Sequence, residues 1–348
     1  TAFLILVTYC VVAGWVLNYL YLALMTGFSG VDASEATTTF DDLLGNAQGM
    51  LFWTLLGLVC TGSIIYGGLQ KGIERAVVIL MPLLFLLMIG LAIYNVIFGG
   101  FEEAVTYLFT ADFDKINPSV MLAAIGQAFF SIGVAMAGMM TFGAYLPKEV
   151  SIGKSVVIII IADTCVALLA GLVIFPAVFN NGLDPAGGPG LIFQTLPVAF
   201  GQMPGGHVVS VVFFLLLSVA AVTSMVGLVE PLVHWLEENK SYTRHKSALL
   251  ILGTIAILSI LSILGYNVLS SYTLLGKDIN GLVDYLSNQI LLPVGGLLIA
   301  IFAGWVVNQK IAVEELDMGD GALFKAWHFL IRFIVPPAVF VVFVLGVM

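Results

Sequence analysis

Two acidic residues, Asp163 and Glu230, lie within long apolar runs of the sequence. A carboxylate in such a run is costly to bury and usually faces a cavity or a partner. We expect Asp163 to bind a cation or carry a proton, and the alternative is a structural acid that is hydrogen-bonded between helices. Glu230 precedes Pro231, so we expect it to cap backbone groups that the proline leaves free.

Two adjacent hydroxyl groups, those of Thr223 and Ser224, occur in the middle of the run that contains Glu230. Together with a nearby carbonyl they have the hard oxygen atoms that suit Na⁺. The alternative is that each hydroxyl bonds back to the preceding helical turn, as Ser and Thr usually do in helices. The residue types leave both interpretations open.

The stretch 119–144 has a centre of small residues, 131–138, beside Phe129 and Phe130. Its composition favours an uninterrupted helix that packs closely through its small residues. The alternative is an unwound segment whose free backbone groups bind a ligand at mid-membrane.

The composition limits the class of protein in which these residues lie. Of the 348 residues, 60% are hydrophobic and 9% are charged, against about 25% charged residues in soluble domains. This excludes a soluble globular enzyme, a disordered chain and a nucleic-acid binder. Unbroken apolar runs also exclude a β-barrel. The three cysteines and four histidines have no metal-ligand spacing, and no phosphate-binding loop is present, so we expect no enzyme and no organic cofactor.

Charge-free apolar runs predict nine membrane-spanning helices with soft boundaries. The segment 185–206 is apolar but broken by Pro and Gly, so we expect an extracellular loop with short helical pieces. The predicted spans are 2–25, 49–69, 76–98, 119–144, 155–179, 207–235, 247–268, 284–308 and 325–347.

The basic residues alternate between the two sets of loops. One set contains nine of them and the other contains only Lys115 and Lys277, which is a strong positive-inside signal. It predicts a multi-pass protein of the cell inner (plasma) membrane, with the loop 26–48 and the C-terminal Met348 outside. The nine predicted inner residues are Lys71, Arg75, Lys148, Lys154, Lys240, Arg244, Lys246, Lys310 and Lys325.

Four segments, in order along the chain, resemble the neurotransmitter:sodium symporters, in particular their bacterial amino-acid branch. This resemblance implies an all-α transporter domain over residues 1–348, with an inverted-repeat fold that is known for its broken helices. The segments are QKGIERAVVILMP (70–82), FTADFDKINPSVMLAAIGQAFFS (109–131), GPGLIFQTLPVAF (188–200) and AAVTSMVGLVEPLVHWLEE (220–238).

The resemblance also implies that this sequence begins at the third helix of the family and lacks the first two. Residues 1–98 would be the remainder of the first repeat, with the third to fifth helices. Residues 99–118 would form an extracellular loop, and 119–308 the second repeat with the sixth to tenth helices. Residues 309–348 would form an inner loop and the eleventh helix.

The resemblance implies one substrate site, two sodium sites and two gates. Its substrate residues are Tyr9, Phe130, Ser131, Gly133, Met136, Ser224 and Leu228. Its first sodium site has Ser131 and Asp163, and its second has Ala220 through the carbonyl, Thr223 and Ser224. Its outer gate has Gln127 and Asp284, and its inner gate has Tyr145 and Glu238, although Gln127 and Tyr145 fit packing roles equally well.

The implied activity is sodium-coupled symport of an amino acid by alternating access, with Na⁺ as the transported ion and the lipid bilayer as the other partner. Ala167 lies where chloride-dependent members carry a serine, while Asp163 brings a fixed negative charge to the same ion, so we expect chloride independence. Amide groups near Gly133 would suit a substrate carboxylate. The alternatives are an H⁺-coupled transporter or channel of the same general fold, or a non-transporting membrane fragment.

Overall fold

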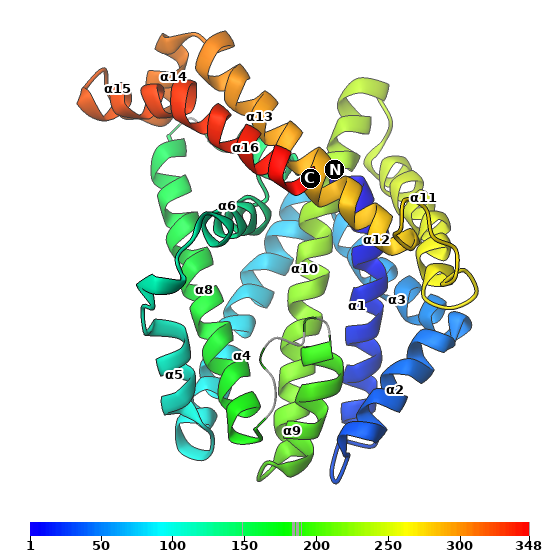
Figure 1. Cartoon of the computed structure of the whole chain (residues 1–348). Coiled ribbons are helices and arrows are strands. Elements are labelled where there is room, and N and C mark those ends of the chain that lie inside the picture. The colour runs from blue at the N-terminus through cyan, green and yellow to red at the C-terminus, as the bar shows by residue number, and fades with distance from the viewer. Residues whose placement is uncertain (148, 183–184, 186–187, 189, 348) are drawn as a thin grey trace. The chain divides into compact units, whose positions relative to one another are not determined.

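The computed structural model describes residues 1–147, 149–182, 185, 188 and 190–347, which form helices joined by loops (Figure 1). Within this part of the chain, β pairing is limited to one isolated bridge between Leu274 and Lys277. The all-α fold class predicted from the sequence is therefore confirmed.

The first half of the chain begins with helices close to the predicted spans. Its elements are α1 (Ala2–Met25), α2 (Ala33–Gly45), α3 (Ala47–Tyr66), the π-helix η1 (Leu69–Glu74), α4 (Arg75–Phe98), α5 (Phe101–Phe109), the 3₁₀ turn η2 (Phe113–Lys115), α6 (Pro118–Ile132), α7 (Gly138–Ala144) and α8 (Ile152–Asn180).

The second half contains four further π-helical segments, three of which continue an α-helix through a span. Its elements are η3 (Leu191–Thr195), α9 (Leu196–Gln202), α10 (Gly206–Lys240), α11 (Arg244–Gly265), α12 (Ile279–Asp284), η4 (Tyr285–Leu291), α13 (Leu292–Ile301), η5 (Phe302–Val306), α14 (Gln309–Leu316), α15 (Ala322–Phe329), η6 (Leu330–Ile334) and α16 (Val335–Val347).

Eight stretches of helix in the described residues are long and apolar enough to cross a membrane. They correspond to eight of the nine predicted spans. The ninth, 119–144, is not one helix but two, α6 and α7, with residues 133–137 between them. The prediction of an uninterrupted helix there is wrong.

The interrupted segment 185–206 contains η3 and α9, which are short helical pieces of the kind predicted there. Their side chains Phe193, Leu196 and Phe200 are buried, so this segment folds onto the protein. Lys148 and Met348, on which part of the predicted orientation rests, lie outside the described residues. The orientation stays a prediction.

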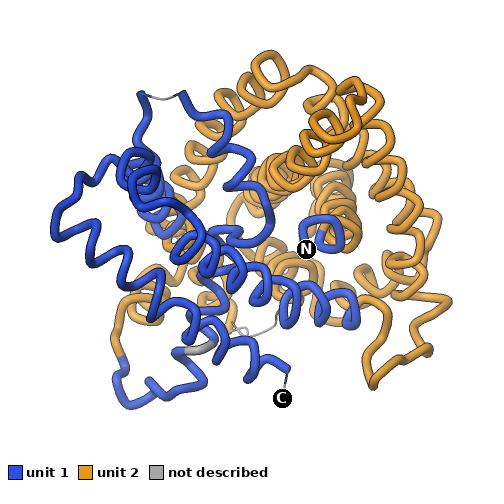
Figure 2. The backbone as a smooth tube through the Cα atoms, turned by 90° about the horizontal axis from the view of Figure 1, so that it is seen from above, with its two compact units in different colours: residues 1–5, 112–165, 281–348 blue, residues 6–111, 166–280 orange. Residues whose placement is uncertain are grey.

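Residues 6–111 and 166–280 form one compact unit, unit 2 (orange in Figure 2). Its central helix is α10, which packs against α3, α4, α9 and α11. Gly14 permits close approach of α1 to α3, because a Cβ atom there would lie 2.8 Å from the Thr54 amide nitrogen. The buried Tyr19 hydroxyl donates a 2.8 Å hydrogen bond to the Phe193 carbonyl. Aromatic packing and close backbone contact thus hold the scaffold of α10.

Residues 1–5, 112–165 and 281–348 form the other compact unit, unit 1 (blue in Figure 2). In it α13 packs against α16 and α6, and η5 against η6. Two glycines of α13 make the close approach possible, since a Cβ on Gly295 would lie 2.8 Å from Ala135 Cβ and one on Gly296 would lie 2.6 Å from the Phe129 ring. The small residues that allow tight packing are therefore on α13. The repeat boundaries at 98, 119 and 308 stay predictions.

Candidate functional site

The break between α6 and α7 has unusual backbone geometry. Gly133 ends α6 with a φ of 71°, and Ala135 and Ala137 adopt φ values of 69° and 63°. Left-handed backbone at an alanine costs roughly 1–2 kcal/mol, so surrounding structure must hold these residues in place. The contact of Ala135 with Gly295 is part of that support. Glycine alone could not signal the break, because a small residue serves close packing and unwinding equally well.

Ser131 and Asp163 meet beside this break. The Ser131 hydroxyl lies 2.9 Å from Oδ1 and 2.8 Å from Oδ2 of Asp163, although the two residues are 32 positions apart. Ser131 lies in the last turn of α6, where the partial negative charge of the helix dipole favours a cation. Three side-chain oxygens at a helix C-terminus form an arrangement that can coordinate a hard cation. The structure thus brings together the two residues predicted for the first sodium site.

The same geometry limits one expectation about the substrate. Gly133 is the end of α6, and the amides of Gly133 and Val134 already bond to the carbonyl of Phe130 and that of Phe129, respectively. The amide end of a helix begins at Gly138, the first residue of α7. The amides of Gly133 and Val134 are therefore engaged. A carboxylate-binding set near Gly133 stays a prediction for the residues that lead into α7, because orphan N–H groups belong to a helix start.

The substrate residues expected in unit 1 lie along the break. Phe130 lines a cavity of about 740 Å³, together with Gln127 of the predicted outer gate. Gly133 lines a second, mostly apolar cavity of about 350 Å³, whose walls include Ile152 and Ile160 of α8. Met136 is buried.

The remaining substrate residues belong to unit 2. The Tyr9 side chain on α1 and the Ser224 side chain on α10 lie close enough to interact. Leu228 is half-buried one turn after the exposed Ser224. These three side chains thus lie in one neighbourhood of α1 and α10, and their substrate role stays a prediction.

The residues predicted for the second sodium site occupy one turn of the unbroken α10. The Thr223 hydroxyl donates to the carbonyls of Val219 and Ala220, at 2.9 and 3.0 Å. The bond-back interpretation therefore holds for Thr223 in this structure. The same contact keeps the hydroxyl beside the Ala220 carbonyl, so both oxygens are available to one ion if the hydroxyl rotates.

Asn288 lies near the predicted outer-gate residues. Its amide donates a 2.6 Å hydrogen bond to Oδ1 of Asp284, one turn earlier in the helix. Asn288 and Gln127 line the same 740 Å³ cavity. The gate roles of Gln127 and Asp284 stay predictions.

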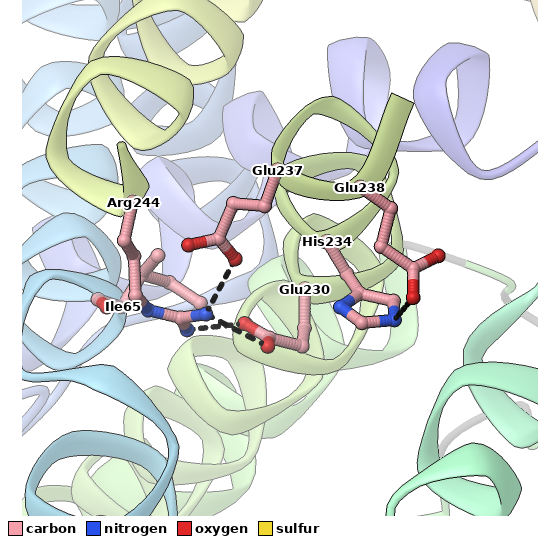
Figure 3. A network of polar contacts seen from close by, with 6 residues as sticks. All are labelled: Ile65, Glu230, His234, Glu237, Glu238 and Arg244. Carbon is pink, nitrogen blue, oxygen red and sulfur yellow. Dashed lines mark hydrogen bonds and ion pairs between the residues drawn. The ribbon is translucent and has the colours of Figure 1, made fainter. Parts of the chain in front are cut away.

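The predicted inner-gate acid Glu238 has a partner that sequence reasoning missed. Nε2 of His234 lies 3.3 Å from Oε1 of Glu238, one turn apart on α10 (Figure 3). The spacing of four residues was a usable signal. Tyr145 follows directly after α7, and its gate role stays a prediction.

Glu230 has a different role from the one expected. Its side chain is fully buried and accepts hydrogen bonds from both terminal nitrogens of Arg244, at 2.6 and 3.1 Å. Arg244 also donates to the Ile65 carbonyl at 2.9 Å and to Glu237 at 3.3 Å (Figure 3). The proline-capping prediction is corrected to a bidentate ion pair between α10 and α11, because a buried carboxylate needs an opposite charge.

Comparison with known proteins identifies relatives along the whole chain. The model of the "Sodium:neurotransmitter symporter family" matches residues 42–348. An uncharacterized sodium-dependent transporter of Haemophilus influenzae is 35% identical over 99% of this chain and 76% of its own length. The uncharacterized sodium-dependent transporter YhdH of Bacillus subtilis is 35% identical over 98% of this chain and 76% of its own length.

A solved structure has the same fold. The crystal structure of MhsT in complex with L-phenylalanine matches with a TM-score of 0.90 and 38% sequence identity, covering 100% of this chain and 79% of MhsT. The family resemblance and the fold predicted from the sequence are confirmed by these comparisons.

Proposed function

Because the chain belongs to the sodium:neurotransmitter symporter family, we propose that it carries an amino acid into the cell together with Na⁺ and without chloride. Family membership makes it a sodium-dependent transporter and a multi-pass membrane protein. An amino-acid substrate is supported by MhsT, which binds L-phenylalanine in its crystal structure.

The observation that carries this proposal is the contact between Ser131 and both oxygens of Asp163. A permanent carboxylate at the ion offsets the positive charge of Na⁺ in the low-dielectric interior, so no halide has to do so. Ala167 lies one turn after Asp163 on α8, and it offers no hydroxyl to a chloride ion.

In the proposed mechanism, Na⁺ binds between the Ser131 hydroxyl and the Asp163 carboxylate. The hydroxyl keeps its proton but rotates it away from Asp163, so that its oxygen lone pair points toward the ion. The break after Gly133, in unit 1, and the Tyr9–Ser224 neighbourhood, in unit 2, are each proposed to contact the substrate. A second Na⁺ binds the Ala220 carbonyl with the hydroxyls of Thr223 and Ser224. Access then alternates around the occupied site.

The membrane potential supplies much of the driving force. One net positive charge that moves inward through 100 mV releases about 2.3 kcal/mol, which corresponds to about fifty-fold accumulation of the substrate. The Na⁺ concentration gradient adds to this amount.

Uptake into proteoliposomes tests the proposal. The complete protein is reconstituted and offered each of the common amino acids, radiolabelled, in sodium chloride, sodium gluconate and choline chloride. We expect uptake of at least one amino acid in both sodium salts and none in choline chloride. A large loss of uptake in gluconate would contradict chloride independence. Uptake in choline chloride driven by an inward proton gradient would contradict sodium coupling and favour Asp163 as a proton carrier.

A further inference from the structure

Arg332 lies at the start of the last apolar helix, in the π-helical segment η6 that leads into α16. Its guanidinium carbon is 5.5 Å from the centre of the Trp305 ring on η5, close enough for a cation–π contact. Gly304 allows η5 and η6 to approach closely, because a Cβ atom there would lie 3.1 Å from Arg332 Cα. The arginine is therefore held against the tryptophan by the backbones of both segments.

Arg332 lacks an acidic partner in this structure. Among the described residues it has no ion pair within 4.0 Å, and its buried Nε has no hydrogen-bond acceptor. A buried donor on a charged group is costly to leave unsatisfied, by more than the roughly 1–3 kcal/mol of a neutral group. The buried Nε is out of reach of an external anion, but the terminal nitrogens of the guanidinium are not among the buried unpaired atoms and can pair with an anion that has oxygen acceptors.

The surroundings indicate where that anion lies. Trp305 is 47% exposed and Phe333 is 52% exposed, and exposed tryptophans of membrane proteins gather at the level of the lipid headgroups. Lys325 and His328 lie in α15, directly before η6, so they are at the same end of this span as Arg332. Basic residues beside a span attract anionic lipids, and a guanidinium binds a phosphate through two parallel hydrogen bonds.

We propose that Arg332, Trp305 and Lys325 form a binding site for the phosphate of an anionic phospholipid at the predicted inner face of the membrane. The guanidinium binds the phosphate oxygens, Trp305 stacks beneath it at the headgroup level, and Lys325 extends the positive potential toward water. The site is confined to unit 1 and is separate from the Ser131–Asp163 pair. It requires neither sodium coupling nor a particular substrate.

Native mass spectrometry of the complete protein, purified with phosphatidylglycerol in mild detergent, tests the site. At phosphatidylglycerol concentrations below saturation, Arg332→Gln should lower the fraction of protein that retains the lipid by about fivefold. This corresponds to about 1 kcal/mol per basic residue. Arg75→Gln is the matched control, because it removes an exposed predicted inner arginine from unit 2, and it should leave retention unchanged. Arg332→Lys keeps the charge and should restore part of the retention.

Two further results decide the source of the phosphate and the role of the ring. Millimolar inorganic phosphate should not displace the lipid, and displacement would overturn the lipid assignment in favour of a soluble anion. Trp305→Leu should lower retention about twofold while keeping all charges, which keeps the proposal testable if Arg332→Gln does not fold. The site would be refuted if Arg332→Gln retained as much lipid as the unmodified protein. If only Trp305→Leu folds, unchanged lipid retention in that variant would refute the site.

Discussion

The two places that offer oxygen atoms for a cation differ in how their helices are built. In unit 1, α6 stops at Gly133, and its last turn presents Ser131 to Asp163 from a neighbouring helix. In unit 2, α10 runs unbroken over 35 residues, and Thr223 satisfies its hydroxyl within its own turn. A broken helix leaves backbone groups at its ends free for a ligand. An unbroken helix has side chains to offer, together with carbonyls that already accept bonds within the helix.

The difference extends to stability. The break in unit 1 contains alanines in a left-handed conformation, which costs folding free energy. The C-terminal part of α10 has a buried bidentate ion pair, Glu230 with Arg244, that ties it to α11 and to the Ile65 carbonyl. We therefore expect substitutions on α10 near Glu230 to affect folding most, and substitutions beside the break to affect ion binding most.

The largest expected effect is on folding. Arg244→Gln leaves the Glu230 carboxylate buried without its bidentate partner, which should destabilise the protein by about 3–5 kcal/mol. This loss is measured by thermal unfolding of the purified protein, with size-exclusion chromatography as the readout of folded protein. Glu237→Gln is the control, because its partly exposed pair with Arg244 at 3.3 Å should contribute less than about 1 kcal/mol. Equal destabilisation by both variants would show that the buried Glu230–Arg244 pair contributes no more to stability than the partly exposed Glu237–Arg244 pair.

The next effect is on sodium. Asp163→Asn removes the fixed charge but keeps an oxygen atom, and it should weaken sodium activation of uptake by about tenfold to a hundredfold, the range for a charged hydrogen-bonding group. Thr164→Val is the control, since the exposed Thr164 hydroxyl bonds back to Ile160 and should leave sodium activation unchanged. An Asp163→Asn variant with normal sodium activation would remove the central role of this carboxylate.

A smaller effect is expected on the unbroken helix. Thr223→Val removes the hydroxyl with little change in shape, and it should weaken sodium activation by about fivefold, corresponding to about 1 kcal/mol for a neutral hydrogen-bonding group. Unfolding temperature should stay nearly constant, because the lost hydrogen bond lies within one helical turn. Unchanged sodium activation in Thr223→Val, with Thr223→Ser as the control that keeps the hydroxyl, would leave Thr223 with a purely structural role.

The smallest expected effect concerns the backbone at the break. Ala135→Gly relieves a left-handed alanine and should stabilise the protein by up to about 1 kcal/mol. Ala128→Gly, in the middle of α6, should instead destabilise it by about 0.5–1 kcal/mol, since glycine loses more conformational freedom in a helix. A fall in unfolding temperature in both variants would show that the surroundings of Ala135 do not tolerate the loss of its methyl group.

Much of the fold could be predicted from the apolar runs, because lipid requires every span to satisfy its own backbone hydrogen bonds. The meeting of Ser131 with Asp163 was predictable only through the family resemblance, since 32 residues of separation carry no geometric signal. The break at 133–137 was missed on composition, because helix propensity treats a packed glycine and an unwound one alike.

The charged partners were the least predictable part. Arg244 follows a short turn after α10, and the sequence assigned it only to the inner set of basic loop residues. Its actual role depends on the reversal of the chain at residues 241–243, which returns the guanidinium to Glu230 fourteen residues earlier. An ion pair between two helices depends on how the helices pack, so helical periodicity in the sequence does not predict it.

The most direct test of the central claim is equilibrium binding of ²²Na⁺ to the complete protein in chloride-free buffer, with and without the amino acid found by uptake. We predict saturable binding that the amino acid strengthens in the unmodified protein, and weak binding in Asp163→Asn. Identical ²²Na⁺ binding by the two proteins in chloride-free buffer would contradict the assignment of Asp163 to the ion.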